Sequence, residues 1–401
     1  MKNPDTGAAT GWFETRLPLR AIYRRYWRDY PVPANLKLTW SFGILVATAL
    51  GVLTLSGIWL GFYYVPTAQG AALSIAELTR GIRFGWLIRD LHRDGTTMLF
   101  GVVYIELLRG IYYGAYRNRR ELAWIIEVVR FFVFLALGFL GFAMTGGADA
   151  DGSVVMMARH LAAIPLFGHA ISHGFLGGFG IDKTTLPRIA MAHEAIGFLV
   201  LLIAALGFAA SRAAPPANPD GIVSLVPHNL EPQFPAYAGR MFTAFILFGL
   251  IFAAIIAFAP GLGQPLGNGI IGSPMAMQVD PAPPWFLLGF HGLARAGQSI
   301  GAPTWFIVVA SLALLGALPW LDRGTVASRR YRPLYGGFVW ILQVDWIVLS
   351  IAAAKPATGP WPAVIDIASG YFFAHFLILT PLITLLEPTH AVPLRITQRT
   401  V

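Results

Sequence analysis

Long apolar runs separated by polar, charged segments dominate the pattern along this chain. A helix of about 20 apolar residues is long enough to cross a bilayer, and the pattern predicts eight such spans. The predicted spans are roughly 38–64, 91–114, 121–144, 185–211, 240–260, 303–321, 335–354 and 362–386. Segments 155–165 and 284–299 between them are expected to form short interfacial helices. The predicted fold class is therefore an all-α polytopic membrane protein with about eight transmembrane helices.

The composition supports a membrane protein and narrows its chemistry. Hydrophobic residues make up 56% of the 401 residues and charged residues only 12%, about half the charged fraction of a typical soluble domain. The net charge of +9 comes from basic loops between the spans, which indicates membrane orientation rather than nucleic-acid binding. The chain contains no cysteine, so disulfides, thiolate-ligated clusters and thioether-linked heme are excluded.

The basic loops predict the orientation of the chain. Arginines gather in 16–28, 117–120 and 323–332 and near the C-terminus. An even number of spans places all of these segments, and both termini, on the same side. Since basic loops stay in the cytoplasm, we expect both termini to be cytoplasmic and the protein to lie in the bacterial inner membrane. The N-terminal segment does not resemble a cleavable signal peptide.

A Pro- and Asn-rich segment divides the predicted spans into two groups of four. Residues 212–239 have the composition of a linker. The sequence therefore predicts an N-terminal four-span bundle over 1–211 and a C-terminal four-span domain over 240–401. We find no convincing internal repeat.

Two of the predicted spans carry one histidine each at the same depth. His92 lies just inside the start of one span, and His193 about two turns into another. Both spans run inward from the periplasmic side, and two neutral imidazoles that face each other are suited to ligate a heme iron. A single buried histidine is more often a packing residue, but a matched pair favours ligands. Fourteen residues further, roughly 21 Å along a helix, the two spans carry Glu106 and Gly207 where a second pair of ligands would stand.

Several motifs carry a family resemblance over nearly the whole chain. They are YPVPANLKLTWSFG, GWLIRDLHRDG, LLRGIYYGAYRNRRELAW, LGGFGIDKTTLPRIAMAH and ALPWLDRG. Together they resemble cytochrome b of the respiratory and photosynthetic cytochrome bc complexes. The resemblance implies a heme-binding four-helix bundle, followed by a four-helix domain that helps to form quinone pockets. It also implies non-covalent heme b, membrane lipid around the chain, and other subunits of a redox complex as partners.

Five residues match the periplasmic-side heme of that family. By resemblance, His92 and His193 are the axial ligands of this heme, and Gly57 and Gly141 are the glycines beside it. Arg89 matches an arginine near the heme propionates, and a guanidinium is a suitable partner for a carboxylate.

The cytoplasmic-side heme of the family lacks its ligands here. Its two ligand positions are Glu106 and Gly207, and Glu127 replaces one of its glycines. We therefore expect this second heme to be absent, so that the chain holds one heme b. A buried carboxylate must be protonated or paired, and Arg130 lies about one turn from Glu127. These acids form either a polar plug in place of the heme or a proton or ion relay.

The quinol-oxidation motif also departs from the family, which carries Pro-Glu-Trp-Tyr. The matching residues here are Pro283, Pro284, Trp285 and Phe286. Proline cannot accept a proton from quinol, and phenylalanine lacks the phenol of tyrosine. His291 is either a substitute base or an ordinary polar residue.

The sequence thus favours a membrane electron-transfer subunit with one periplasmic-side heme. It would exchange electrons with quinone or a periplasmic redox partner, without the full bifurcated quinol cycle. Whether it is an enzyme stays open; an active chain would be a redox subunit of a quinol:cytochrome c oxidoreductase-like complex. One alternative is a structural or anchor subunit with little or no heme. The other is a proton or ion path through Glu106 and Glu127.

Overall fold

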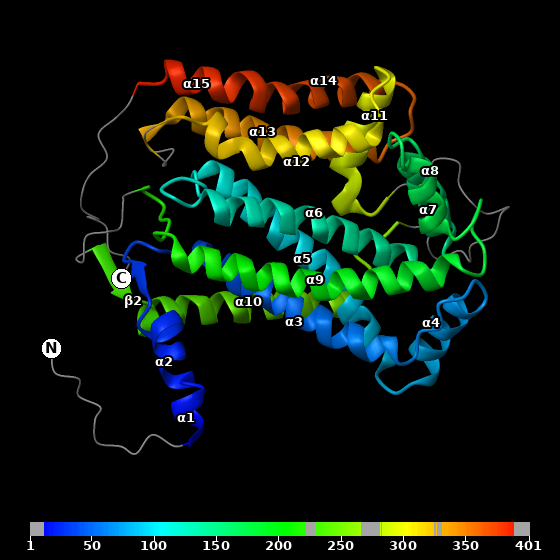
Figure 1. Cartoon of the computed structure of the whole chain (residues 1–401), viewed down its shortest axis with the longest axis horizontal. Helices are drawn as coiled ribbons and strands as arrows, with labels where there is room; N and C mark the ends of the chain where they lie inside the picture. The colour runs from blue at the N-terminus through cyan, green and yellow to red at the C-terminus, as the bar shows by residue number, and fades with distance from the viewer. Residues whose placement is uncertain are drawn as a thin grey trace.

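The structure is a computed structural model that describes residues 12–221, 229–265, 281, 283–324, 326 and 331–388. Long helices run side by side along one axis, and short helices close the two ends (Figure 1). The long helices are α3 (Phe42–Gly61), α5 (Gly85–Tyr112), α6 (Glu121–Ala143), α9 (Thr185–Ala213), α10 (Ala238–Phe258), α12 (Thr304–Leu321) and α13 (Pro333–Ala353). A further span, Trp361–Leu386, consists of α14 (Trp361–Ala374), η8 (His375–Leu379) and α15 (Thr380–Leu386).

Among the described residues, seven helices are long and apolar enough to cross a membrane. They contain α3, α6, α9, α10, α12, α13 and the span formed by α14, η8 and α15. Helix α5 lies within the same bundle (Figure 1) and has 28 residues, but Arg, Asp and Glu side chains make it more polar than the other long helices. The chain is therefore an all-α integral membrane protein, as the sequence predicts.

The short elements distinguish the two ends of the bundle. One end carries α1 (Trp12–Arg16), α2 (Leu19–Tyr23) and η1 (Arg24–Arg28), together with the end of α15 (Figure 1). There β1 (Pro31–Pro33) pairs antiparallel with β2 (Leu230–Pro232), and Val32 stands opposite Glu231. The opposite end carries α4 (Gly70–Gly81), α7 (Ala148–Ala162), α8 (Gly168–Leu176) and α11 (Leu288–Ser299). The first and last described helices therefore lie at the same end.

The observed boundaries differ from the predicted ones in a few places. Helix α5 begins at Gly85, six residues before the predicted start, because its charged first turns extend beyond the apolar run. The expected interfacial helix at 155–165 is the longer α7, followed by α8, and the one at 284–299 corresponds to η6 (Trp285–Leu287) and α11. Helix α4 was not expected. Part of the basic loops, including Arg329, Arg330, Arg395 and Arg399, lies outside the described residues.

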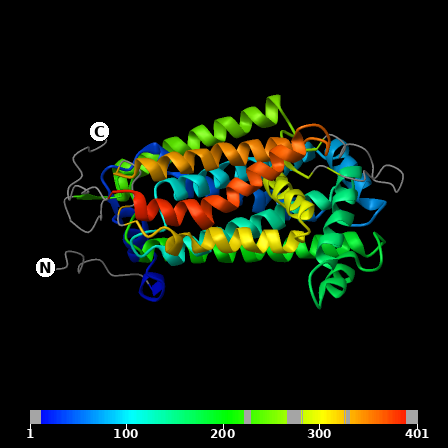
Figure 2. The same cartoon turned by 90° about the horizontal axis from the view of Figure 1, so that it is seen from above.

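One apolar core joins the two predicted halves of the chain. Phe131 and Val200 of the first half belong to the same buried cluster as Phe286, Leu318 and Val339 of the second. The segment between them leaves α9 at Ala213 and enters α10 at Ala238. The two groups of spans therefore pack as one body, and the view turned by 90° also shows them side by side (Figure 2).

A buried polar cluster also joins the halves at the end that carries α1. Asp322 accepts a hydrogen bond from Tyr116 (2.5 Å) and pairs with Arg332 at 2.8 Å and Arg117 at 2.9 Å. We call these four residues the Asp322 cluster. Burial would raise the pKa of Asp322, but hydrogen bonds and charge from Arg332, with the charge of Arg117, hold it below its usual value. The cluster ties the loop after α5 to the loop after α12.

Candidate functional site

The two predicted ligands face each other near one end of the bundle. His92 lies in the second turn of α5 and His193 in the third turn of α9, and both helices start at the end that carries α4, α7 and α8. Their ring centroids are 6.3 Å apart, with 71° between the ring planes. An imidazole nitrogen lies about 2 Å from a metal that it ligates, so two rings on one ion stand about 6 Å apart. The spacing fits a single metal ion held between the rings.

Backbone carbonyls orient both imidazoles. Nδ1 of His92 lies 3.1 Å from the carbonyl oxygen of Leu53, and Nδ1 of His193 lies 3.1 Å from that of Leu137. When Nδ1–H donates to a carbonyl, the lone pair of the neutral ring is on Nε2, and the ring is fixed as a metal ligand. The two histidines therefore have the tautomer and the support that metal-ligating imidazoles require.

Gly57 and Gly141, the two glycines that match the family pattern, lie directly against these rings. Gly57 follows Leu53 by four residues on α3, and Gly141 follows Leu137 by four residues on α6. A Cβ on Gly57 would lie 2.9 Å from Cε1 of His92, and one on Gly141 would lie 3.0 Å from Cε1 of His193. Such contacts are too short for a side chain. In this structure each glycine therefore gives room to an imidazole.

Ser56 makes the two ligands unequal. Its Oγ lies 3.1 Å from Nδ1 of His92 and donates to the carbonyl of Val52 at 2.6 Å. On α6 the corresponding position, three residues after Leu137, is the apolar Leu140. His92 therefore has a second hydrogen-bond partner where His193 is bonded to a carbonyl alone. The sequence analysis missed Ser56; a hydroxyl next to Gly57 in an apolar helix was the available signal.

Arg89 stands one turn before His92 on α5. Its guanidinium is 3.9 Å from the carboxylate of Asp90, and its side chain is 34% exposed. Asp90 bonds more closely to Arg93, at 2.9 Å. The guanidinium of Arg89 is therefore only loosely paired with Asp90. It is available to pair with another anionic group.

Of the two positions of the second ligand pair, one holds the charged Glu106 and the other the glycine Gly207. Arg130 of α6 donates to Glu106 of α5 at 2.9 Å and also bonds to Glu127 of its own helix. We call Glu106, Glu127 and Arg130 the ion triad. Its side chains are only 11% to 21% exposed. Gly207 of α9, which supplies no ligand, lies against Ile126. Both carboxylates are thus paired, and ion pairs between α5 and α6 stand where a second ligand pair would be.

The residues of the altered quinol motif are largely packed into the core. Pro283 and Pro284 are buried, and Phe286 is 2% exposed. The ring of Phe286 stacks on Phe100 with centroids 3.9 Å apart, and its carbonyl accepts a hydrogen bond from Tyr104. None of the four motif side chains can exchange a proton. His291 lies half-buried on α11.

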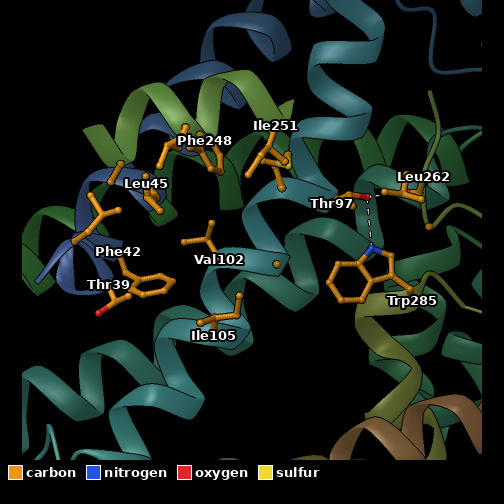
Figure 3. Close-up of a pocket in the computed structure, with 16 residues that line it drawn as sticks. Thr39, Phe42, Leu45, Thr97, Val102, Ile105, Phe248, Ile251, Leu262 and Trp285 are labelled. Carbon is orange, nitrogen blue, oxygen red and sulfur yellow. Dashed lines mark hydrogen bonds between the residues drawn. The ribbon is translucent and has the colours of Figure 1, made fainter. Parts of the chain in front are cut away.

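An apolar cleft of about 660 Å³ lies between α3, α5 and α10, with Trp285 at one end (Figure 3). Its lining includes Phe42, Leu45, Thr97, Val102, Ile105, Phe248, Ile251, Leu262 and Trp285. The indole of Trp285 donates to Thr97 Oγ1 at 3.4 Å, and Thr97 donates to the carbonyl of Leu262. The cleft occupies the side of α5 turned away from His92. Its lining suits a hydrocarbon chain and offers no acid or base.

Comparisons with known proteins agree on one family. The model for "Cytochrome b/b6/petB" matches residues 27–214, and that for "Cytochrome b(C-terminal)/b6/petD" matches residues 272–373. Cytochrome b of Rickettsia bellii is 32% identical over 384 residues, 95% of each chain. Cytochrome b of Rhodospirillum rubrum is 31% identical over 390 residues, 97% of this chain and 96% of its own. A chain of a solved hyperthermophilic respiratory Complex III superposes with a TM-score of 0.85 and 28% identity, covering 94% of this chain and 99% of its own.

Proposed function

The chain belongs to the cytochrome b family, as a membrane electron-transfer subunit of the kind found in respiratory bc complexes, and we propose that it holds one heme b between His92 and His193. The observation that carries this proposal is the 6.3 Å separation of the two ring centroids. This is the distance that one bridging metal ion requires, and each ring is also held by a backbone carbonyl in the tautomer of a metal ligand.

The residues around the pair each have a part in holding the heme. Nε2 of His92 and of His193 would hold the iron from its two faces, while the carbonyls of Leu53 and Leu137 keep the rings oriented. Arg89 would pair with a propionate. When bound, the heme supplies a one-electron couple whose potential depends on its ligands and their hydrogen bonds.

The second heme of the family is absent in this proposal. The ion triad supports this, since a carboxylate–guanidinium network occupies the level at which a second pair of imidazoles would stand. A single heme near one face cannot carry electrons across the whole bilayer. The four motif positions 283–286 also lack a carboxylate to accept a quinol proton. The chain would therefore not perform the full bifurcated quinol cycle.

We place the histidine pair on the periplasmic side of a bacterial inner membrane, with both termini in the cytoplasm. The arginines of α1, α2 and η1 and of the loop after α5 support this orientation, because they lie at the opposite end of the bundle from the histidines. Within this frame, 1–211 is the heme bundle, 212–239 the linker, and 240–401 the second four-span domain.

Electrons would pass between the heme and either a membrane quinone or a periplasmic redox protein. The likeness to a respiratory Complex III chain supports quinone and further subunits of a redox complex as partners. The cleft beside Trp285 supports contact with a hydrocarbon chain, such as a lipid acyl chain or the isoprenoid tail of a quinone.

Two other functions use the same residues differently. A structural anchor with little or no heme would need only the shared core and the ion triad as a polar plug. A proton or ion path would instead run through Glu106 and Glu127. Because one guanidinium pairs both carboxylates, the ion triad favours the plug over the path. If Glu106→Gln abolishes transport-linked activity while heme content is unchanged, the path is supported.

A potentiometric titration of the purified protein tests the proposed function. With one heme, the b-type absorbance should change in a single one-electron transition. Two transitions of equal amplitude would contradict the single-heme proposal, and a protein without reducible heme would favour the anchor.

A further inference from the structure

The N-terminal helical segment lies across the direction of the spans. In Figure 1, α1 and α2 run at right angles to the long helices, at the end of the bundle where β2 lies. Figure 2, turned by 90°, places the same segment at the same end and beside the bundle. Because the long helices cross the membrane, a segment at right angles to them at their ends lies in the plane of the membrane surface.

Residues Leu19–Arg28, which form α2 and η1, are amphipathic. Apolar residues recur at the spacing of one helix face, i, i+3, i+4, i+7 and i+8. They are Leu19, Ile22, Tyr23, Tyr26 and Trp27. The opposite side carries Arg20, Arg24 and Arg28 at intervals of four residues, with Arg25 beside them. Every residue of this segment is exposed, so the described part of the chain leaves most of the apolar side uncovered.

The segment is held to the bundle at its C-terminal end. The ring of Trp27 stacks on Phe208 near the end of α9, with centroids 6.0 Å apart. The guanidinium of Arg212 lies 3.9 Å from the ring of Tyr30. These contacts fix where the segment leaves the bundle. They engage Trp27 and leave the rest of the apolar side open.

We propose that Leu19–Arg28 is an interfacial helix that binds anionic phospholipid headgroups. The region from Trp12 to Tyr30 has five arginines against two acids, Glu14 and Asp29, a net charge of +3. The ion pair between Arg28 and Asp29 is long, at 3.8 Å, and both side chains are about half exposed. This pair therefore does not neutralise the positive charge of the basic side. An amphipathic helix of this kind inserts its apolar side at the acyl boundary, while guanidinium groups bond to phosphates with two hydrogen bonds.

The chain has no cysteine, so one introduced cysteine labels a single position of the full-length protein. Ile22→Cys reports the apolar side, and Ala21→Cys is the matched control on the basic side that leaves all charges in place. Each variant carries a nitroxide label in lipid nanodiscs of phosphatidylcholine with or without phosphatidylglycerol. Electron paramagnetic resonance power saturation then measures the contact of each label with oxygen, which enters lipid, and with a water-soluble nickel chelate.

In phosphatidylglycerol nanodiscs, the label at residue 22 should be several-fold less accessible to nickel and more accessible to oxygen than the label at residue 21. The difference should shrink in pure phosphatidylcholine, and also when Arg20, Arg24, Arg25 and Arg28 are all changed to Gln. Equal nickel access at both positions would overturn the proposal, because the segment would then lie in water. Shielding of residue 22 from both reagents would also overturn it, in favour of a protein partner such as a second copy. Immersion that is independent of lipid charge would overturn the recognition of anionic headgroups.

Discussion

His92 and His193 face each other with their ring centroids 6.3 Å apart, and each donates from Nδ1 to the carbonyl four residues before a glycine on the neighbouring helix. The same local arrangement thus occurs twice, once between α5 and α3 and once between α9 and α6. In both places the missing Cβ admits the imidazole to a carbonyl one turn earlier. Two pairs of helices therefore bring together two imidazoles whose Nδ1 atoms are each held by a carbonyl.

Loss of one ligand should remove the heme. In His193→Ala, the b-type absorbance should disappear, because a single remaining imidazole cannot hold the iron from both faces. The visible spectrum of the purified variant measures this. His169→Ala is the control, since His169 is an exposed histidine on α8 at the same end of the bundle. Persistence of the spectrum in His193→Ala would show that the ligand is another residue.

The glycines should matter through the histidine rings. Gly57→Ala should lower heme affinity by about 10–100-fold, the usual effect of disturbing a group that supports a metal ligand, because its methyl group would displace His92. Gly43→Ala on the same helix is a matched control, since a Cβ there meets nothing within 4 Å. Heme retained per chain after dialysis against apomyoglobin distinguishes the two. Equal retention in both variants would mean that Gly57 has no such role.

Ser56 should tune the heme potential without being needed for binding. A hydrogen bond from Nδ1–H makes an imidazole ligand more basic, which favours the oxidised iron. Ser56→Ala removes one of two such bonds to His92, so the midpoint potential should rise by up to about 60 mV, the equivalent of a hydrogen bond of about 1.5 kcal/mol. Redox titration measures the shift, and heme content should stay unchanged. An unchanged or lower potential would contradict the proposed role.

The Asp322 cluster should make stability depend on pH in the acid range. The folded pKa of Asp322 is held below its unfolded value, which is about 3.9. The stabilisation is therefore present above about pH 4 and is lost as the pH falls through the folded pKa. Asp322→Asn should cost about 3–5 kcal/mol at neutral pH, because it leaves Arg332 buried without its partner. Unfolding midpoints in detergent from pH 7 to pH 3 should converge for the two proteins; a constant gap would argue against this role.

The sequence predicts the spans well because bilayer thickness imposes one simple requirement on each of them. Even α5, with its charged residues, is recognisable because apolar residues continue on both sides of Glu106. Helix α4 was missed because it alternates small, polar and charged residues without a long apolar run. Strands β1 and β2 have three residues each and pair across some 200 positions, so local sequence contains no trace of their pairing.

Some features of the candidate site could likewise be predicted from the sequence, and others could not. The equal depth of His92 and His193, and the acids at the second level, follow from spacing along helices. The bonds to the Leu53 and Leu137 carbonyls, and the pairing of Arg130 with both Glu106 and Glu127, depend on how neighbouring helices are rotated. The Asp322 cluster joins residues about 200 positions apart. These features required the packed structure.

The number of hemes per chain tests the central claim most directly. A pyridine hemochrome assay, with protein measured by quantitative amino-acid analysis, should give one heme b per chain for the native sequence. The variant Glu106→His, Glu127→Gly, Gly207→His, which restores both ligand positions and the lost glycine, provides the comparison and should approach two. Two hemes in the native protein would contradict the account of the ion triad, and none would contradict the assignment of His92 and His193.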